Sequence, residues 1–254
     1  MSRFFFSRLI SKTPDVAECA NMITDEQPID SWKALSTLVE QQFKKRWICR
    51  GVRKSCYQLR PGIGRTGARR DVQGHDLPYD VNEEQHQIRQ FMLEARAKFE
   101  WEPKTPLEWM ILGQHHRLPT RLLDWSESLL VATYFAVEDP RFEAAIYGVE
   151  APSELEDLKV DPFGHEIGDV PRLIRPPHIS PRITAQKGVL TLHPIPDHDW
   201  DAAGIHRWKI EKDATFTLKG ILDFCGVHAA SLFPDSADRH TEHLAWLHKR
   251  GRLS

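Results

Sequence analysis

The chain has 254 residues, of which 41% are hydrophobic and 28% are charged, and its formal net charge at pH 7 is −2. A chain of this size can bury a hydrophobic core as one large domain, or as one domain with a small appendage. The small net charge gives no general attraction to nucleic acid or to anionic membranes, and leaves only local charged patches for such partners. No stretch is apolar over the length that crosses a bilayer, so we expect no membrane contact.

The cysteines and the N-terminal residues indicate in which cellular compartment the protein is expected. The four cysteines, at positions 19, 49, 56 and 225, have no spacing that suits a metal site, and we expect reduced thiols in a cytoplasmic protein. Arg8 and Lys12 interrupt the apolar run that starts the chain, so no signal peptide is predicted. Residues 1–29 are interpreted as an N-terminal arm, and residues 30–254 as one domain.

The start of the domain predicts a helix, a strand and a basic loop. Apolar residues recur at helical spacing over residues 32–43, and residues 47–52 form a short β-like run. That run contains Arg50-Gly51, in which the glycine permits a close approach of backbone to a ligand and the arginine can bind a phosphate or carboxylate. Residues 57–70 are rich in glycine and arginine, but they lack the ending of a phosphate-binding P-loop. A loop near an anionic ligand and an ordinary solvated loop both stay open.

Two helices are predicted next, over residues 82–99 and 107–112, and the second leads into Gln114-His115-His116. Pro119 ends it, because the residue before a proline is disfavoured in helical conformation. A strand is predicted over residues 120–125. Ser126 is then expected to cap a helix over residues 127–137, whose apolar residues cover most of its circumference.

The second half of the domain alternates strands with irregular sequence. Residues 144–150 predict a central strand, and the proline-rich residues 151–182 predict a long irregular region. Strands are expected after Gly188 and over residues 208–210, followed by helices over residues 217–224 and 238–249. The cluster Asp197-His198-Asp199 is crowded and favours a turn, so no metal site is predicted.

The segment from Gln114 to Trp125 concentrates reactive side chains ahead of a strongly apolar helix. It contains adjacent histidines, arginines, a threonine, an aspartate and a tryptophan. Our hypothesis is that it forms the floor of a functional site. Two alternatives remain open: Arg121 and Asp124 can form a buried ion pair that fixes the strand, and one of the histidines can be structural.

Separated motifs in this chain resemble those of the FRG domain family. The first is Ile48-Cys49-Arg50-Gly51, with cysteine in the place of an aromatic residue. The most specific is Gln114–Ser126, followed by Ala132–Ala136; the family usually carries a small residue at the position of Arg117. The others are Pro181–Val189 and Ser231–Pro234. The resemblance covers residues 30 to about 245.

The order of these elements resembles, more distantly, the arginine-serine-glutamate class of ADP-ribosyltransferases. That likeness implies NAD as a substrate, and it implies an α+β fold: a single mixed domain with a twisted, mainly antiparallel sheet flanked by helices. It also implies a set of cofactor-binding residues: Arg50, Gly51, Gln114, Thr120, Arg121 and Trp125. In this set the arginines hold phosphates, Thr120 and Gln114 hold the ribose or amide, and Trp125 stacks on the nicotinamide.

The motif Pro181–Val189 departs from the transferase pattern, since Gln186 stands where the catalytic glutamate is expected. A neutral amide can donate a hydrogen bond, but it cannot stabilise the positive charge that develops when the ribose–nicotinamide bond breaks. Asp124 is the best substitute carboxylate in the sequence, and His115 or His116 is the candidate general base. The predicted catalytic set is therefore Asp124, His115 and Gln186.

The leading hypothesis is a cytoplasmic, NAD-dependent ADP-ribosyltransferase that acts as a toxin or anti-phage effector on a nucleic acid or a protein, with a neutralising partner protein as a further expectation. The alternative is a non-catalytic module that binds a nucleotide or nucleic acid with the same arginines and tryptophans. NAD hydrolysis without transfer is a third option. The absence of the glutamate favours the binding module, and the polar cluster from Gln114 to Trp125 favours the enzyme.

Overall fold

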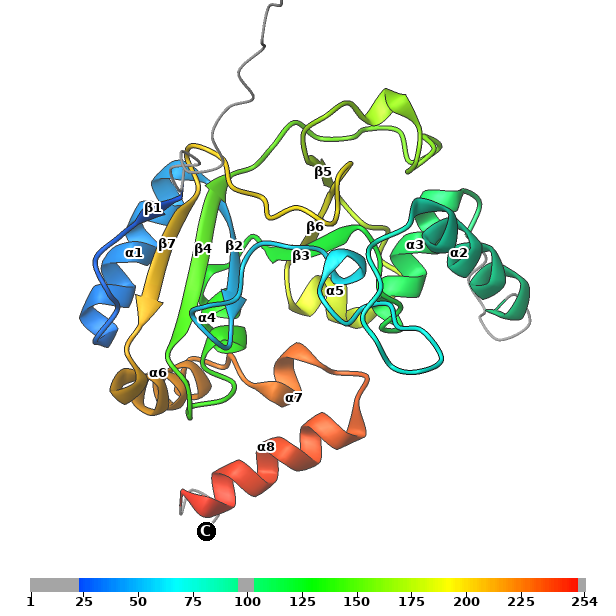
Figure 1. Cartoon of the computed structure of the whole chain (residues 1–254). Helices are drawn as coiled ribbons and strands as arrows, with labels where there is room; N and C mark the ends of the chain where they lie inside the picture. Colours follow the sequence, from blue (N-terminus) through cyan, green and yellow to red (C-terminus); the bar gives the residue numbers. More distant parts are fainter. Residues whose placement is uncertain (1–22, 96–102, 251–254) are drawn as a thin grey trace, which may run out of the picture.

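The computed structural model describes residues 23–95 and 103–250. Its centre is a seven-stranded sheet of order β1-β7-β4-β2-β3-β6-β5, in which every pairing is antiparallel except that of β1 with β7 (Figure 1). The strands are β1 (Thr24–Asp25), β2 (Trp47–Val52), β3 (Leu122–Ser126), β4 (Ala144–Glu150), β5 (Arg172–Ile174), β6 (Gly188–Leu192) and β7 (His206–Ile210).

Helices flank this sheet, which confirms the predicted mixed α+β class with a mainly antiparallel sheet. They are α1 (Trp32–Lys45), α2 (Val81–Ala95), α3 (Pro106–His115), α4 (Leu129–Ala136), α5 (Pro181–Ala185), α6 (Lys212–Phe224), α7 (Ala229–Leu232) and α8 (Ala237–Lys249), with short 3₁₀ turns η1 (Gly62–Gly64) and η2 (His165–Ile167). Figure 1 shows α8 running along the periphery, away from the sheet, and it contains no buried residue.

The core is divided between the two halves of the sheet. Helices α1, α4 and α6 pack on β2, β4 and β7 through one cluster of buried apolar side chains. Helices α2 and α3 contribute to a separate cluster with β3, β5 and β6. Burial of this apolar surface is the main driving force for folding. Each half-sheet therefore has its own helical support.

Helix α4 approaches β2 unusually closely, and Gly51 makes this approach feasible. A Cβ atom at Gly51 would lie 1.8 Å from the main-chain oxygen of Ala132, far inside van der Waals contact. Glycine at this position lets the helix lie directly on the strand. Gly51 was expected to let the backbone approach a ligand, and the element that fills the space beside it is instead helix α4.

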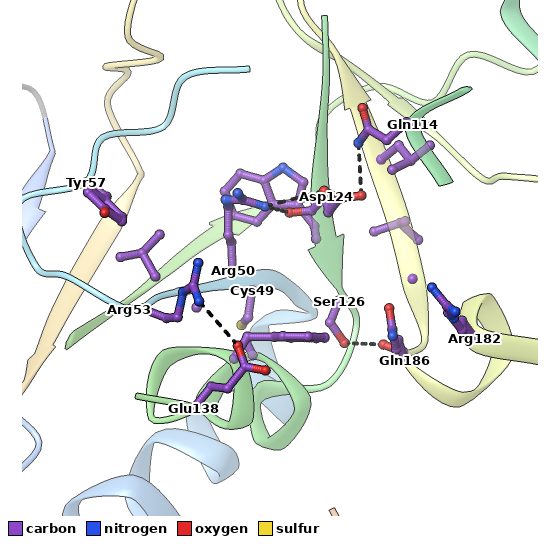
Figure 2. Close-up of a pocket in the computed structure, with 18 of the residues that line it drawn as sticks. Cys49, Arg50, Arg53, Tyr57, Gln114, Asp124, Ser126, Glu138, Arg182 and Gln186 are labelled. Atoms are coloured by element: carbon purple, nitrogen blue, oxygen red, sulfur yellow. Dashed lines mark hydrogen bonds and ion pairs between the residues drawn. The ribbon is translucent and has the colours of Figure 1, made fainter. Parts of the chain in front are cut away.

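The sheet is nearly split between β2 and β3. Their ladder contains the single residue pair Cys49–Ser126, whereas β2 and β4 share six pairs and β3 and β6 share five. Beyond Cys49 the two strands separate, so Arg50 and Asp124 face each other across an opening and not across a regular ladder. Figure 2 shows these residues between the diverging strands.

Most of the predicted elements are confirmed, with differences at their ends. The helix after β3 begins later than expected: Ser126 is the last residue of the strand and Ser128 is the N-cap, while the Ser126 hydroxyl accepts a hydrogen bond from the Ser128 amide. The region predicted as irregular over residues 151–182 contains β5 and η2, and its end begins α5. The helix predicted to residue 99 is observed to Ala95; residues 96–99, like 1–22 of the predicted arm, lie outside the described residues.

Candidate functional site

A cavity of about 890 Å³ occupies the opening between β2 and β3 (Figure 2). Its volume lies within the range of roughly 300–1,000 Å³ that is typical of ligand pockets. The residues from Cys49 to Val52 of β2, the next residue Arg53, and the residues from Asp124 to Ser126 of β3 line it. Consecutive side chains of a strand point to opposite faces of a sheet, so a cavity that contacts all of them lies at an open strand edge. The split in the sheet therefore creates the cavity.

Arg50 lies at the centre of this cavity, on β2. Its Nη1 donates a hydrogen bond to the main-chain oxygen of Asp124 at 2.6 Å, and lies 4.0 Å from Oδ2 of the same residue. Its Nε is buried and has no hydrogen-bond partner among the described residues. Burial lowers the pKa of the Arg50 guanidinium, and the charge of Asp124 opposes this shift. A partly buried cation whose buried Nε is an unused donor favours an anionic ligand, since unsatisfied buried polar groups are costly.

Asp124 presents an oriented carboxylate beside Arg50. Its side chain is 67% exposed, compared with 18% for Arg50. Oδ1 accepts a hydrogen bond from Nε2 of Gln114 at 2.9 Å, and Oε1 of Gln114 in turn accepts one from the hydroxyl of Thr120. That hydroxyl also accepts a hydrogen bond from the Leu122 amide, so the donor direction along the chain is fixed. This series of hydrogen bonds orients the Asp124 carboxylate through Oδ1, and Oδ2 lies on the side of Arg50, 4.0 Å from Nη1.

His115 ends α3 and lines the cavity next to Asp124. Burial lowers the pKa of His115 below its ordinary value, and the charges of His116 and Arg182 lower it further, although Asp235 and Asp124 act in the opposite direction. The ring is therefore neutral at pH 7 and able to accept a proton. The pKa of His116 is also lowered, chiefly by burial, but His116 does not line the cavity.

The lining is strongly cationic for a chain whose net charge is −2. Its arginines outnumber its carboxylates by six to three: Arg50, Arg53, Arg60, Arg65, Arg182 and Arg239 against Asp124, Glu138 and Asp199. A cavity with low-dielectric walls and lining charges mainly of one sign focuses the electrostatic field and attracts ions of the opposite sign. The cavity is therefore suited to an anion such as a phosphate.

The structure separates Arg121 from the other predicted site residues. Arg121 is buried and pairs with Glu84 of α2, with Nη2 and Oε2 2.8 Å apart, and it does not line the cavity. The suggested ion pair of Arg121 with Asp124 is wrong: Arg121 forms a buried ion pair with Glu84, and Asp124 lies beside Arg50. Arg121 has no access to a ligand in this cavity, so its predicted role with NAD phosphates is not supported by its position. Thr120 is also outside the lining and contacts the site through Gln114.

Trp125 and Gln186 line the cavity, but their polar atoms already have partners within the protein. Nε1 of Trp125 donates to the hydroxyl of Thr191, and the side chain is almost completely buried. Nε2 of Gln186 donates to the main-chain oxygen of Leu232. Trp125 therefore has little free surface for stacking, and the Gln186 amide attaches the end of α7 to the site.

Several lining residues were not predicted as site residues: Tyr57, Glu138, Arg182, Phe233 and Arg239. Arg182 and Phe233 stand in the motifs Pro181–Val189 and Ser231–Pro234, so the family resemblance included these positions but assigned them no role. Arg182 could have been predicted as a site residue because it stands in the same motif as Gln186, a few positions before it. Arg239 and Glu138 belong to helix ends whose proximity depends on the tertiary fold.

Residues 45–144 match the family model of the FRG domain. The chain therefore contains an FRG domain, and the matched segment includes Arg50, Gln114, His115 and Asp124, while Gln186 lies beyond it. No curated protein and no solved structure gives a significant match. Among the described residues, no group of three or more His, Cys, Asp or Glu is placed to hold a metal ion. Over the same residues, the helices are too short or too polar to cross a membrane.

Proposed function

We propose that the FRG domain binds NAD in the cavity between β2 and β3 and acts as an ADP-ribosyltransferase. The observation that carries this proposal is the pairing of a partly buried cation with an oriented anion: the buried Nε of Arg50 has no partner among the described residues, and the exposed Asp124 carboxylate lies beside the guanidinium. The Arg50 guanidinium suits a phosphate, and the Asp124 carboxylate suits a centre that becomes positive during the reaction.

The transfer can be written with the residues of this site. The bond between C1′ of the ribose and the nicotinamide nitrogen breaks, and its electron pair leaves with nicotinamide. Asp124 stabilises the cation-like ribose, while a nucleophile of the acceptor forms the new bond to C1′. The acceptor proton passes to the neutral ring of His115. Arg50 holds the pyrophosphate, and Gln114 with Thr120 keeps the carboxylate in position.

A non-catalytic binding module for a nucleotide or nucleic acid is the second candidate. It is favoured by Gln186, which supplies no negative charge and whose amide is already bonded to Leu232. Release of nicotinamide distinguishes the two candidates, since the binding module releases none. Release without a labelled acceptor would identify NAD hydrolysis, in which water is the nucleophile.

The decisive experiment incubates the full chain with NAD labelled in its adenylate group and with cell extract, and measures nicotinamide release and label transfer. Asp124→Asn retains the shape and removes the charge, and we expect it to slow release by about 100-fold or more. Arg50→Gln should abolish saturable NAD binding. Arg141→Gln is the matched control, because Arg141 pairs with Asp139 and does not line the cavity. Normal NAD turnover by Asp124→Asn would refute the proposal.

A toxin or anti-phage role follows from NAD consumption in the cytoplasm, and a growth assay tests it. Expression of the wild type should stop growth, expression of Asp124→Asn should not, and a neutralising partner protein should restore growth when it is coexpressed. Equal growth with both variants at equal protein levels would exclude the toxin role.

A further inference from the structure

The cavity extends past Asp124 to a wall built by the C-terminal segments. Phe233, directly after α7, is partly exposed and lines this wall, and the guanidinium groups of two arginines lie near its ring. The Cζ of Arg239 is 4.5 Å from the centroid of its ring, and that of Arg182 is 5.5 Å away. The edge of its ring meets Phe135 of α4. We call Arg182, Phe233 and Arg239 the aromatic wall.

The arginines of the aromatic wall are held by carboxylates that a ligand can replace. Arg182 pairs with Asp235 and Arg239 pairs with Glu138, each at 2.7 Å, and Arg239 also pairs with Glu242 at 2.9 Å; all five side chains retain solvent contact. Partly exposed ion pairs contribute little net stability, so their arginines can exchange a carboxylate for a phosphate. A phosphate at this wall would receive charge-assisted hydrogen bonds from planar, forked donors.

The aromatic wall lies on the acceptor side of the proposed reaction. The charges of both Asp124 and Arg182 act on the ring of His115, which lines the same cavity as both residues. Tyr57 and Arg53 lie on the opposite side of Arg50 in Figure 2. Arg65 also acts electrostatically on Arg50, from the loop after β2. NAD phosphates at Arg50 and Arg65 would leave the aromatic wall free for the second substrate.

We propose that this second substrate is a single-stranded nucleic acid, an inference that rests on the proposed function. An unpaired base stacks on Phe233, and the adjoining phosphates contact Arg182 and Arg239. Aromatic rings flanked by arginines bind single strands in this manner, because every base has a face to stack and every backbone has phosphates. A nucleophilic atom of the acceptor then bonds to C1′ of the ribose, nicotinamide leaves with the bonding electrons, and His115 takes the acceptor proton.

Binding can be measured without NAD, with fluorescein-labelled 12-nucleotide DNA and RNA strands and fluorescence anisotropy. We expect Phe233→Leu to weaken binding by about tenfold. Arg239→Gln should weaken it and reduce its salt dependence. Arg141→Gln should bind as the wild type does. Thermal unfolding of each variant checks the fold, and Arg239→Gln keeps the test decisive if Phe233→Leu does not fold. The DNA and RNA strands distinguish which sugar the site accepts.

Transfer provides the second test and separates this inference from the proposed function. Label from NAD should appear on the oligonucleotide, and Phe233→Leu should lose this transfer while it retains NAD binding. Arg50→Gln should lose NAD binding while it retains the oligonucleotide. Oligonucleotide affinity that is equal in the wild type, Phe233→Leu and Arg239→Gln would overturn the inference, as would label found only on proteins. Absence of NAD binding by the wild type would instead refute the proposed function.

Discussion

Replacement of Glu84 by alanine should destabilise the fold strongly, because it would leave the charge of Arg121 buried without its acid. The Arg121 side chain is 4% exposed and that of Glu84 is 0% exposed. Glu84 accepts hydrogen bonds from the main-chain amide, Nε and Nη2 of Arg121, and from the hydroxyl of Tyr79. In Glu84→Ala these donors lose the carboxylate, although Nη1 of Arg121 still donates to the main-chain oxygen of Pro162 and Nη2 to the hydroxyl of Tyr79.

The expected loss is about 3–5 kcal/mol of unfolding free energy, the usual cost of breaking a buried ion pair by removing one partner. Since total stabilities are about 5–15 kcal/mol, this is a large fraction of the whole. The double variant Arg121→Met/Glu84→Leu should recover most of the loss, because it buries no unpaired charge. Urea unfolding followed by circular dichroism measures all three proteins.

A loss below about 1 kcal/mol in Glu84→Ala would contradict the assignment of this pair as structural. The same experiment decides the role of Arg121 in ligand binding. Arg121→Met should reduce stability while the folded protein keeps its affinity for NAD. A tenfold weaker affinity without a change in stability would show that Arg121 contacts the ligand after all.

Three further predictions follow from single residues. His193 is buried and its pKa is lowered to about 3, chiefly by burial, so the unfolded state binds an extra proton below pH 6.5. The free energy of unfolding should therefore fall by about 1.4 kcal/mol per pH unit as the pH drops from 6.5 toward 4. His193→Gln should flatten this slope when unfolding free energies are measured by urea titration at each pH. Gly51→Ala should lower the unfolding midpoint markedly or prevent folding, because the new methyl group would collide with the main chain of Ala132. Burial raises the pKa of the Cys49 thiol to about 12, so iodoacetamide at pH 8 should alkylate exposed Cys56 and spare Cys49 until the protein unfolds, as mass spectrometry can show.

Elements with a strong periodic pattern could be predicted from the sequence. Helix α1 repeats apolar residues at helical spacing, and β4 is a continuous apolar run, so each carries its own local signal. Strand β5 has three residues in a proline-rich region, and its place in the sheet depends on pairing with β6 and not on its own pattern. The prediction that Ser126 is a helix N-cap was wrong for a related reason. Ser126 pairs with Cys49 and so belongs to the strand, although its local preference is for a helix cap.

The partners of the site residues were less predictable than the residues themselves. The motif from Gln114 to Trp125 indicated correctly that several polar side chains gather near β3. Sequence proximity suggested that Arg121 would pair with Asp124, but consecutive residues of a strand alternate faces, and the acid that meets Arg121 lies 37 positions earlier on α2. A local pattern contains no information on a partner that a separate helix supplies.

The limited pairing of β2 with β3 gives Arg50 a structural role as well as its proposed role in ligand binding. A continuous ladder would supply main-chain donors to the Asp124 carbonyl, whereas here the Arg50 guanidinium donates to it at 2.6 Å. One edge of the guanidinium thus bridges the two half-sheets, and the buried Nε remains for a ligand. A phosphate at Nε would draw on the same group that joins the strands, so ligand binding and the width of the opening are coupled through a single side chain. Loss of NAD binding in Arg50→Gln must therefore be compared with its unfolding free energy, because only a loss of affinity at unchanged stability reports on the ligand alone.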